Sequence, residues 1–276
     1  MNRWLRWTRP LGRHAILLLT SAFALVPFVW MLSLSLKSPG EMFHSLSLWP
    51  EQFHALENYR EALTSAPLPR FLLNGVLVCT AILVLQLLIC APCAYALAKL
   101  DFKGRDALFA LVLVALFIPH QVLALPLFVL CYKLGILDTY TALVLPFIVS
   151  PFGIFLLRQF FKTIPDDIVH AARLDGVSEL GIVWRVMVPM ATPAVTAFAI
   201  FSAVGHWNDL FWPLIVVTSE KIMPPAQGIV SFHNGELGIQ YGPLMAGAVL
   251  VVAPLVLGFL FAQRTFIAGL TLGGVK

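Results

Sequence analysis

Six runs of mostly apolar residues divide this sequence, and each is long enough to cross a lipid bilayer. A helix that spans a hydrocarbon core of roughly 30 Å needs about 20 residues, because it rises about 1.5 Å per residue. Only 12% of the residues are charged, whereas soluble proteins average about 25%. We therefore predict an all-α polytopic membrane protein and exclude an ordinary soluble enzyme. The six expected transmembrane helices cover residues 14–36, 71–98, 107–131, 140–161, 193–217 and 243–262.

The distribution of Lys and Arg predicts how these helices are oriented. Thirteen of the 18 Lys and Arg residues fall in the N-terminal segment, the second and fourth connections and the C-terminal tail, and five fall on the other side. Since cytoplasmic loops carry the excess of positive charge, we expect both termini in the cytoplasm. The net charge of +4 reflects this orientation. The first run could be a signal peptide, but its length and the lack of a small-residue cleavage site favour an anchor.

The fourth connection, residues 158–190, is expected to form two short helices joined by a tight turn. Asp166 and Asp167 place negative charge in the first turn of the first helix, where the helix dipole favours it. Gly176 can adopt the left-handed conformation that ends a helix, and Ser178 can cap the next one. The pattern therefore predicts a helical hairpin between two spans.

The residues of this hairpin are compatible with three roles to different degrees. The spacing of Ala172, Gly176 and Ile182 fits a DNA-binding helix-turn-helix, but the second helix carries a single cation, Arg185, and a DNA duplex needs many phosphate contacts. We therefore expect no nucleic acid as a partner. An interfacial hairpin without a partner is the second alternative. We favour a docking element, because the small side chains at 171 and 172 allow another protein to approach closely.

Two long connections lie on the opposite side of the membrane. Residues 37–70 carry several Glu residues and a short helix near residues 58–63, which is typical of an interfacial amphipathic segment or of a partner contact. Residues 218–241 have few charges. They are either a plain linker or a folded loop that faces a partner or a vestibule.

The fifth apolar run contains the densest group of polar side chains, which includes Trp207, Asn208 and Asp209. Asp209 is the only carboxylate placed well inside a run. Polar groups within a membrane are costly, so they indicate function by default. Two interpretations stay open: the three residues line a substrate pathway, or Asp209 accepts hydrogen bonds from backbone freed near Pro213 or sits at the outer interface.

The sequence lacks the motifs of common enzymes. It has no GxxxxGK[ST] phosphate loop, no HExxH or GxSxG motif and no zinc-spaced Cys/His cluster, so we expect no catalytic residues, no metal and no cofactor. The energy for any transport must come from an ion gradient or from another subunit. A gradient-driven secondary transporter or channel is the alternative, although such carriers usually contain several buried acids and matching broken helices.

The hairpin resembles the EAA loop of ABC importer permeases. The resembling segment is His170-Ala171-Ala172-Arg173-Leu174-Asp175-Gly176 and continues to Pro189. Other segments are similar to the six-span permease of the carbohydrate-importer branch, typified by the maltose and glycerol-phosphate permeases. They are Asn58-Tyr59-Arg60-Glu61-Ala62-Leu63, Ala94-Tyr95-Ala96-Leu97-Ala98, Phe102-Lys103-Gly104-Arg105, Ile118-Pro119, Trp207-Asn208-Asp209, Trp212-Pro213-Leu214 and the tail from Gly269 to Lys276.

This resemblance implies a type I ABC importer permease fold, a location in the bacterial inner membrane and transport of a sugar or sugar derivative. It also implies three partners: a second related permease, two copies of a cytoplasmic ABC ATPase that bind the ATP, and an extracytoplasmic solute-binding protein. Ala171, Ala172, Asp175 and Gly176 would form the core that couples to the ATPase. His170 takes the position where the family usually has Glu, so the negative charge of the family is absent there.

The expected organisation has three parts. Residues 1–70 would form an N-terminal segment, the first transmembrane helix and an external loop. Residues 71–264 would form the permease core with five helices and the coupling loop 158–190. Residues 265–276 would form a cytoplasmic tail, which in the family can touch the ATPases, while the 218–241 loop can reach the binding protein.

Overall fold

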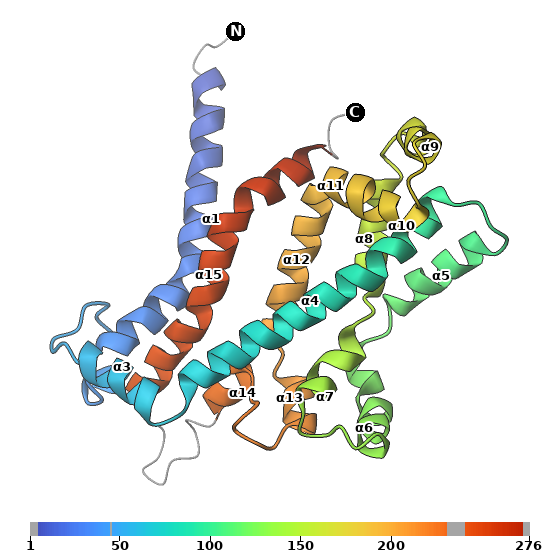
Figure 1. Ribbon diagram of the computed structural model, residues 1–276. Helices are drawn as coiled ribbons and strands as arrows, with labels where there is room; N and C mark the ends of the chain where they lie inside the picture. Colours follow the sequence, from blue (N-terminus) through green and yellow to red (C-terminus); the bar gives the residue numbers. More distant parts are fainter. Residues whose placement is uncertain (1–4, 45, 231–240, 273–276) are drawn as a thin grey trace. The chain divides into compact units, whose positions relative to one another are not determined.

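A computed structural model of the protein describes residues 5–44, 46–230 and 241–272 (Figure 1). All regular secondary structure in these segments is helical, which confirms the all-α class. The chain divides into two compact units. The first unit is Met1–Leu68 with Ile229–Ala253, and the second unit is Pro69–Gly228 with Pro254–Lys276.

The first unit is held together by hydrogen bonds between its helices and loops. The side-chain amide of Asn58 donates to the carbonyl oxygens of Ser35 and Lys37, each at 2.9 Å, and so satisfies the last carbonyl groups of the first helix. The helix expected near residues 58–63 is confirmed as α3. The helices of this unit are α1 (Leu5–Leu36), α2 (Glu41–His44), α3 (Ala55–Thr64) and the first part of α15 (Tyr241–Leu272).

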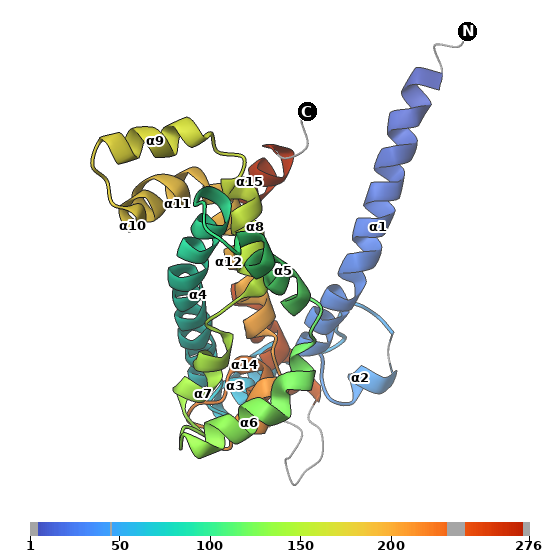
Figure 2. The ribbon, with the colours of Figure 1, turned by 90° about the vertical axis from the view of Figure 1, so that its right-hand side faces the viewer.

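The second unit holds the remaining helices. Figures 1 and 2 show α9 and α10 at one end of this unit and α6, α7 and α13 at the other end, with α4 running between the two ends. These helices are α4 (Leu68–Lys99), α5 (Arg105–Ala115), η1 (His120–Leu123), α6 (Ala124–Lys133), α7 (Tyr140–Val144), η2 (Leu145–Phe147), α8 (Pro151–Phe161), α9 (Asp166–Leu174), α10 (Glu179–Ile182), η3 (Val183–Met187), α11 (Val188–Met190), α12 (Thr192–Trp207), α13 (Phe211–Val216) and α14 (Pro225–Val230).

Three helices within the described residues are long and apolar enough to cross a membrane without a break: Arg13–Leu36, Leu68–Lys99 and Tyr241–Gln263. Three further candidates are bent pairs, so the described chain has up to six spans. The pairs are Arg105–Ala115 with His120–Lys133, bent by 94°, Tyr140–Phe147 with Pro151–Phe161, bent by 44°, and Glu179–Met190 with Thr192–Trp207, bent by 86°.

Proline chemistry accounts for the first two bends. Pro119 lies in an extended conformation and has no N–H to continue a helix. Pro151 occupies the first position of α8, where its fixed φ is suited to a helix start, and the Ser150 hydroxyl accepts the N–H of Gly153 at 3.0 Å. The expected run 193–217 is also not one helix. It stops at Trp207 and restarts at Phe211, with Asn208 as the C-terminal cap.

Two apolar cores stabilise the two ends of the second unit. One core surrounds the last turns of α4 and includes Tyr95, Phe161 and Met187. The other lies between α4, α7 and α13 and includes Ile82 and Trp212. Between them α8 and α12 approach closely, because a Cβ atom built on Gly153 would lie only 2.6 Å from Cζ of Phe198.

Candidate functional site

The hairpin between α9 and α10 forms as the sequence predicts. Gly176 has φ +76°, a left-handed conformation that a Cβ atom would strain. The N–H of Gly176 donates to the carbonyl of Arg173, and the N–H of Val177 donates to the carbonyl of Ala172, each at 3.0 Å. This pair of bonds is a Schellman motif, which ends α9 with its carbonyl groups satisfied. Ser178 then caps α10 through the N–H of Gly181 at 3.2 Å.

The expected second helix of the hairpin, from residue 179 to residue 188, has three parts in the structure. It begins as α10, continues as the π-helical turn η3 and ends as α11, which contains Pro189. A π-helical turn re-aims the side chains that follow it. The hairpin leads through this segment into α12, after the 86° bend at Ala191.

The outer face of the hairpin exposes small and apolar groups. His170, Ala171, Asp175 and Gly176 are exposed, whereas Ala172 is half-buried against the core. Two apolar side chains lie on either side of the turn: Leu174 is 90% exposed and Leu180 is 62% exposed. This face therefore offers a closely approachable backbone flanked by two large apolar groups.

Two polar anchors attach the hairpin to the end of α4. The ammonium group of Lys99 donates to Oδ1 of Asp166 and to the carbonyl of Ile164, each at 2.5 Å. This hydrogen bond from Lys99 lowers the pKa of Asp166. The second anchor joins three side chains. The Tyr95 hydroxyl donates to Oε2 of Glu179 at 2.5 Å, and Nε of Arg173 donates to Oε1 of Glu179 at 2.8 Å.

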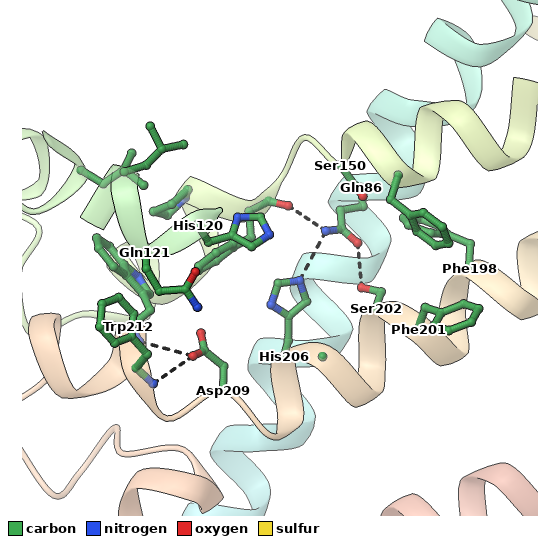
Figure 3. A pocket seen from close by; sticks show the side chains of 17 residues that line it. Gln86, His120, Gln121, Ser150, Phe198, Phe201, Ser202, His206, Asp209 and Trp212 are labelled. Atoms are coloured by element: carbon green, nitrogen blue, oxygen red, sulfur yellow. Dashed lines mark hydrogen bonds between the residues drawn. The ribbon is translucent and has the colours of Figure 1, made fainter. Parts of the chain in front are cut away.

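A second candidate site is a pocket of about 350 Å³ in the second unit, with polar side chains on several of its walls (Figure 3). This volume lies within the range of about 300–1,000 Å³ that is usual for ligand pockets. The polar lining residues are Gln86, His120, Gln121, Ser150, Ser202, His206 and Asp209. The aromatic ones are Phe147, Phe152, Phe198, Phe201, Phe211 and Trp212.

Gln86 organises one side of this pocket. The Gln86 side chain is 4% exposed. Its amide nitrogen donates to the carbonyl of Phe147 at 2.8 Å, and its amide oxygen accepts the hydroxyl of Ser202 at 2.7 Å. The Nε2 atom of His206 lies 3.4 Å from the same amide nitrogen. Gln86 thus joins α4 to η2 and to α12, since interhelical hydrogen bonds replace those that water would supply.

The structure separates the three residues of the predicted substrate pathway. Asp209 lines the pocket, and its Oδ1 atom accepts the N–H groups of Phe211 at 3.0 Å and Trp212 at 3.3 Å, so it also satisfies two backbone donors at the start of α13. Trp207 is buried and approaches α4 at Gly75. Asn208 is exposed, and its amide donates to the carbonyl of Val204 at 2.9 Å. Neither of these two residues lines the pocket.

Two exposed residues of the hairpin were missed by the sequence prediction. Leu174 and Leu180 were not singled out, although an apolar side chain beside a left-handed turn is a signal for an exposed contact. Gln86 and Tyr95 are polar residues of the second apolar run, which the sequence assigns either to a pathway or to interhelical hydrogen bonds, but no local pattern identifies their partners. No group of three or more His, Cys, Asp or Glu residues that could hold a metal ion is found among the described residues.

Comparison with known proteins identifies the family to which the chain belongs. Residues 88–271 match the family described as the binding-protein-dependent transport system inner membrane component, and this range is well over half of the chain. The chain belongs to this family. It is therefore a membrane permease of a binding-protein-dependent importer, a transport subunit and not an enzyme.

Curated relatives and solved structures agree with this membership. The chain is 43% identical over 203 residues to the arabinooligosaccharides transport system permease protein AraQ of Halalkalibacterium halodurans, covering 74% of this chain and 72% of the relative. It is 34% identical over 263 residues to the diacetylchitobiose uptake system permease protein NgcG of Streptomyces coelicolor, covering 94% and 87%. A chain of a bacterial ABC transporter involved in the import of alginate superimposes with a TM-score of 0.83 at 23% identity, over 96% of this chain and 99% of that chain. The last likeness confirms the importer permease fold.

The two sites lie at different places in this permease. The hairpin falls within the matched residues 88–271, and so do all pocket residues except Gln86. Part of the predicted outer loop 218–241 and of the predicted tail 265–276 lies outside the described residues. Within the described part of that loop, α14 packs against α4, because a Cβ atom on Gly228 would lie 2.1 Å from the ring of Phe71.

Proposed function

We propose that this permease imports a sugar or sugar derivative and that a cytoplasmic ATPase drives it by docking on the α9–α10 hairpin. The observation that carries the proposal is the exposed face of the hairpin. The turn at Gly176 is left-handed, and the small side chain of Ala171 and the apolar side chains of Leu174 and Leu180 are all exposed close to it in the sequence. Apolar groups exposed together around a rigid turn support a protein contact.

The sugar cargo is supported by the names of the relatives. Two of them are described as permeases for arabinooligosaccharides and diacetylchitobiose. A third, 31% identical over 261 residues, is the trehalose transport system permease protein SugB of Mycobacterium tuberculosis, which covers 94% of this chain and 94% of that relative. These cargoes are all carbohydrates, so we infer the same chemical class here.

The proposed assembly contains a second related permease, two ATPase copies that bind the ATP, and an extracytoplasmic solute-binding protein. Each ATPase would hold one hairpin in a cleft, and ATP-driven closure would move the anchored helices as rigid bodies. The excess of Lys and Arg on the hairpin side supports a cytoplasmic location of the hairpin and of both termini. Residues 170–172 and 175–176 would form the contact, with His170 in place of the usual Glu.

The docking proposal is tested by placing a charge on the exposed face of the hairpin. We expect Leu174→Glu to insert into the membrane normally but to lose most of the co-purifying ATPase, because the carboxylate must be desolvated in an apolar contact. Leu134→Glu is the matched control. Leu134 is 55% exposed and follows α6, at the end of the second unit away from the hairpin.

The readout is the amount of ATPase subunit that co-purifies with a tagged permease, together with ATP-dependent sugar uptake. Undiminished co-purification with Leu174→Glu would contradict docking on this face. Sugar uptake by the purified chain alone, driven by an ion gradient and indifferent to ATP, would favour the secondary-transporter alternative.

A further inference from the structure

Three separate interruptions of the membrane-spanning helices meet at one pocket. His120 and Gln121 follow the break at Pro119, Phe147 and Ser150 flank the break before α8, and Asp209 lies in the break between α12 and α13. Non-helical backbone at membrane depth is tolerated only where it is buried in protein or lines a wet cavity. Three breaks at one cavity therefore indicate that the cavity has polar contents.

We propose that this pocket is a saccharide-binding site on the permease itself and that it accepts uncharged sugars and rejects anionic ones. The inference rests on the proposed function, because it takes sugar as the transported class. Beyond that function, the pocket would be the place where the sugar binds, and Asp209 would determine its preference for uncharged ligands.

Apart from His120 and His206, the lining of the pocket has one ionisable side chain, and it is acidic. Asp209 is the only Asp, Glu, Lys or Arg among the residues that line it, all of which are described. A phosphate or carboxylate ligand would lose its hydration here without gaining a Lys or Arg partner, and it would be repelled by the aspartate. A neutral hydroxyl group can instead donate to the carboxylate. The charge distribution thus favours uncharged ligands.

The free hydrogen-bonding groups of the pocket suit hydroxyl groups. Only Oδ1 of Asp209 is engaged by the backbone of α13, which leaves Oδ2 with no hydrogen-bond partner among the described residues. The side-chain amide of Gln121 likewise makes no hydrogen bond within the described part of the chain, whereas its backbone carbonyl accepts the N–H of Ala124. The side chains of Gln121 and Asp209 point toward one another in Figure 3. A carboxylate acceptor beside an amide that both donates and accepts can bind adjacent sugar hydroxyls.

Aromatic walls complete the site. Phe147 makes ring contacts with His206, at a centroid distance of 4.9 Å, and with Trp212 at 6.2 Å, so the rings form one continuous surface. A mostly apolar and aromatic lining with a few placed polar groups is typical of small-molecule pockets. The amide nitrogen and oxygen of Gln86 are each engaged, by Phe147 and Ser202, so Gln86 supports the wall while the side chains of Gln121 and Asp209 stay available.

The experiment is ATP-dependent uptake by proteoliposomes that contain the full complex with its ATPase and binding protein. The probes are radiolabelled arabinotriose, diacetylchitobiose and trehalose as neutral sugars, and alginate oligosaccharide and glycerol phosphate as anions. We expect uptake of a neutral probe only. We expect Asp209→Asn and Gln121→Ala to raise the KM for that probe about tenfold or more, since a hydrogen bond to a charged group is lost or weakened.

Asp138→Asn is the matched control for the structural role of Asp209. Oδ1 of Asp138 accepts two backbone N–H groups, from Thr218 and Ser219, at 2.9 Å each, and Asp138 does not line the pocket. An Asn side chain keeps an oxygen acceptor for backbone N–H groups at either position. We therefore expect Asp138→Asn to leave the KM unchanged.

The outcomes separate this inference from the proposed function. Wild-type uptake of a neutral probe with an unchanged KM in Asp209→Asn and Gln121→Ala would overturn the saccharide site and leave the proposed function intact. Uptake of an anionic probe by the wild type would overturn the charge preference alone. Absence of any ATP-dependent sugar uptake by the wild-type complex would overturn both.

Discussion

The hydroxyl group of Tyr95 lies 2.5 Å from Oε2 of Glu179, so a buried side chain of α4 holds the second helix of the hairpin. The same helix carries Gln86, which organises the pocket wall. These two residues of α4 are about 14 Å apart along the axis, at about 1.5 Å per residue. One continuous helix, which contains Pro92 between these two residues, therefore links the hairpin to the pocket. A displacement of the hairpin thus has a short path to the proposed sugar site.

Replacing Tyr95 with Phe should loosen the hairpin without disturbing the core. The ring is retained, but Glu179 loses one hydrogen bond and keeps its pair with Arg173. Because the Glu179 side chain is 48% exposed, we expect a loss of only about 1 kcal/mol. Hydrogen exchange of the amides in residues 166–182 should become faster. Tyr132→Phe, at a residue that is 69% exposed, is the control, and equal exchange in both variants would argue against the anchor.

The effect of a substitution at Gly176 should depend on how easily the new residue adopts a left-handed backbone conformation. Nothing lies within 4 Å of a Cβ atom built there, so strain at φ +76° and not crowding decides the outcome. We expect Gly176→Asn to be milder than Gly176→Val, because Asn visits this region more easily and a left-handed residue costs about 1–2 kcal/mol for other side chains.

For both Gly176 variants we would measure the amount of ATPase that co-purifies and the amount of permease inserted in the membrane. Insertion should stay normal in both variants, whereas ATPase binding should fall in the order Gly, Asn, Val. Val binding as much ATPase as Asn would show that the turn conformation is unimportant for docking.

Gly153→Ala should destabilise the contact between α8 and α12. The added methyl group would lie 2.6 Å from Cζ of Phe198, and overpacking a close contact costs about 1–3 kcal/mol. The melting temperature of the purified protein should fall. Adding Phe198→Leu should recover part of the loss, because it removes the clashing ring.

A glycine with open space around it controls for helix propensity. Nothing lies within 4 Å of a Cβ atom on Gly258 in α15, so Gly258→Ala should be neutral or slightly stabilising, since Ala is the better helix former. A similar drop in melting temperature at both positions would show that the Phe198 contact is not the cause.

Acid should weaken the loop that Asp138 organises. The N–H groups of Ser219 and Thr218 hold the pKa of Asp138 below its usual value of 3.8. The stabilisation from this carboxylate is therefore fully present above pH 3.8 and is lost as the pH falls through the lowered pKa. The stability difference between the wild type and Asp138→Asn, followed by thermal unfolding across pH, should be constant near neutrality and shrink in acid. A constant difference down to the lowest pH would contradict this role.

The hairpin is the part of the candidate site that the sequence predicts best. Asp166, Gly176 and Ser178 encode a helix start, a left-handed stop and a new cap within a few residues, and the structure confirms each of them. Turn and cap chemistry acts over three or four residues, so it is readable from local sequence. The predicted substrate pathway was less well defined. Trp207, Asn208 and Asp209 are consecutive, yet only Asp209 reaches the pocket, because the helix ends between them and turns the other two away.

The sequence alone determined that this is a membrane protein with six apolar runs and a tight hairpin between two of them. These features depend on the length of a run, on its charges and on its turn residues, all of which can be recognised locally. The tertiary structure decided that three helix breaks share one pocket and that α4 anchors the hairpin. Those relationships join residues that are 61, 84 and 120 positions apart, as between Gln86 and Phe147, Tyr95 and Glu179, and Gln86 and His206. No periodicity specifies such pairs, since they arise only when separately formed helices pack against one another.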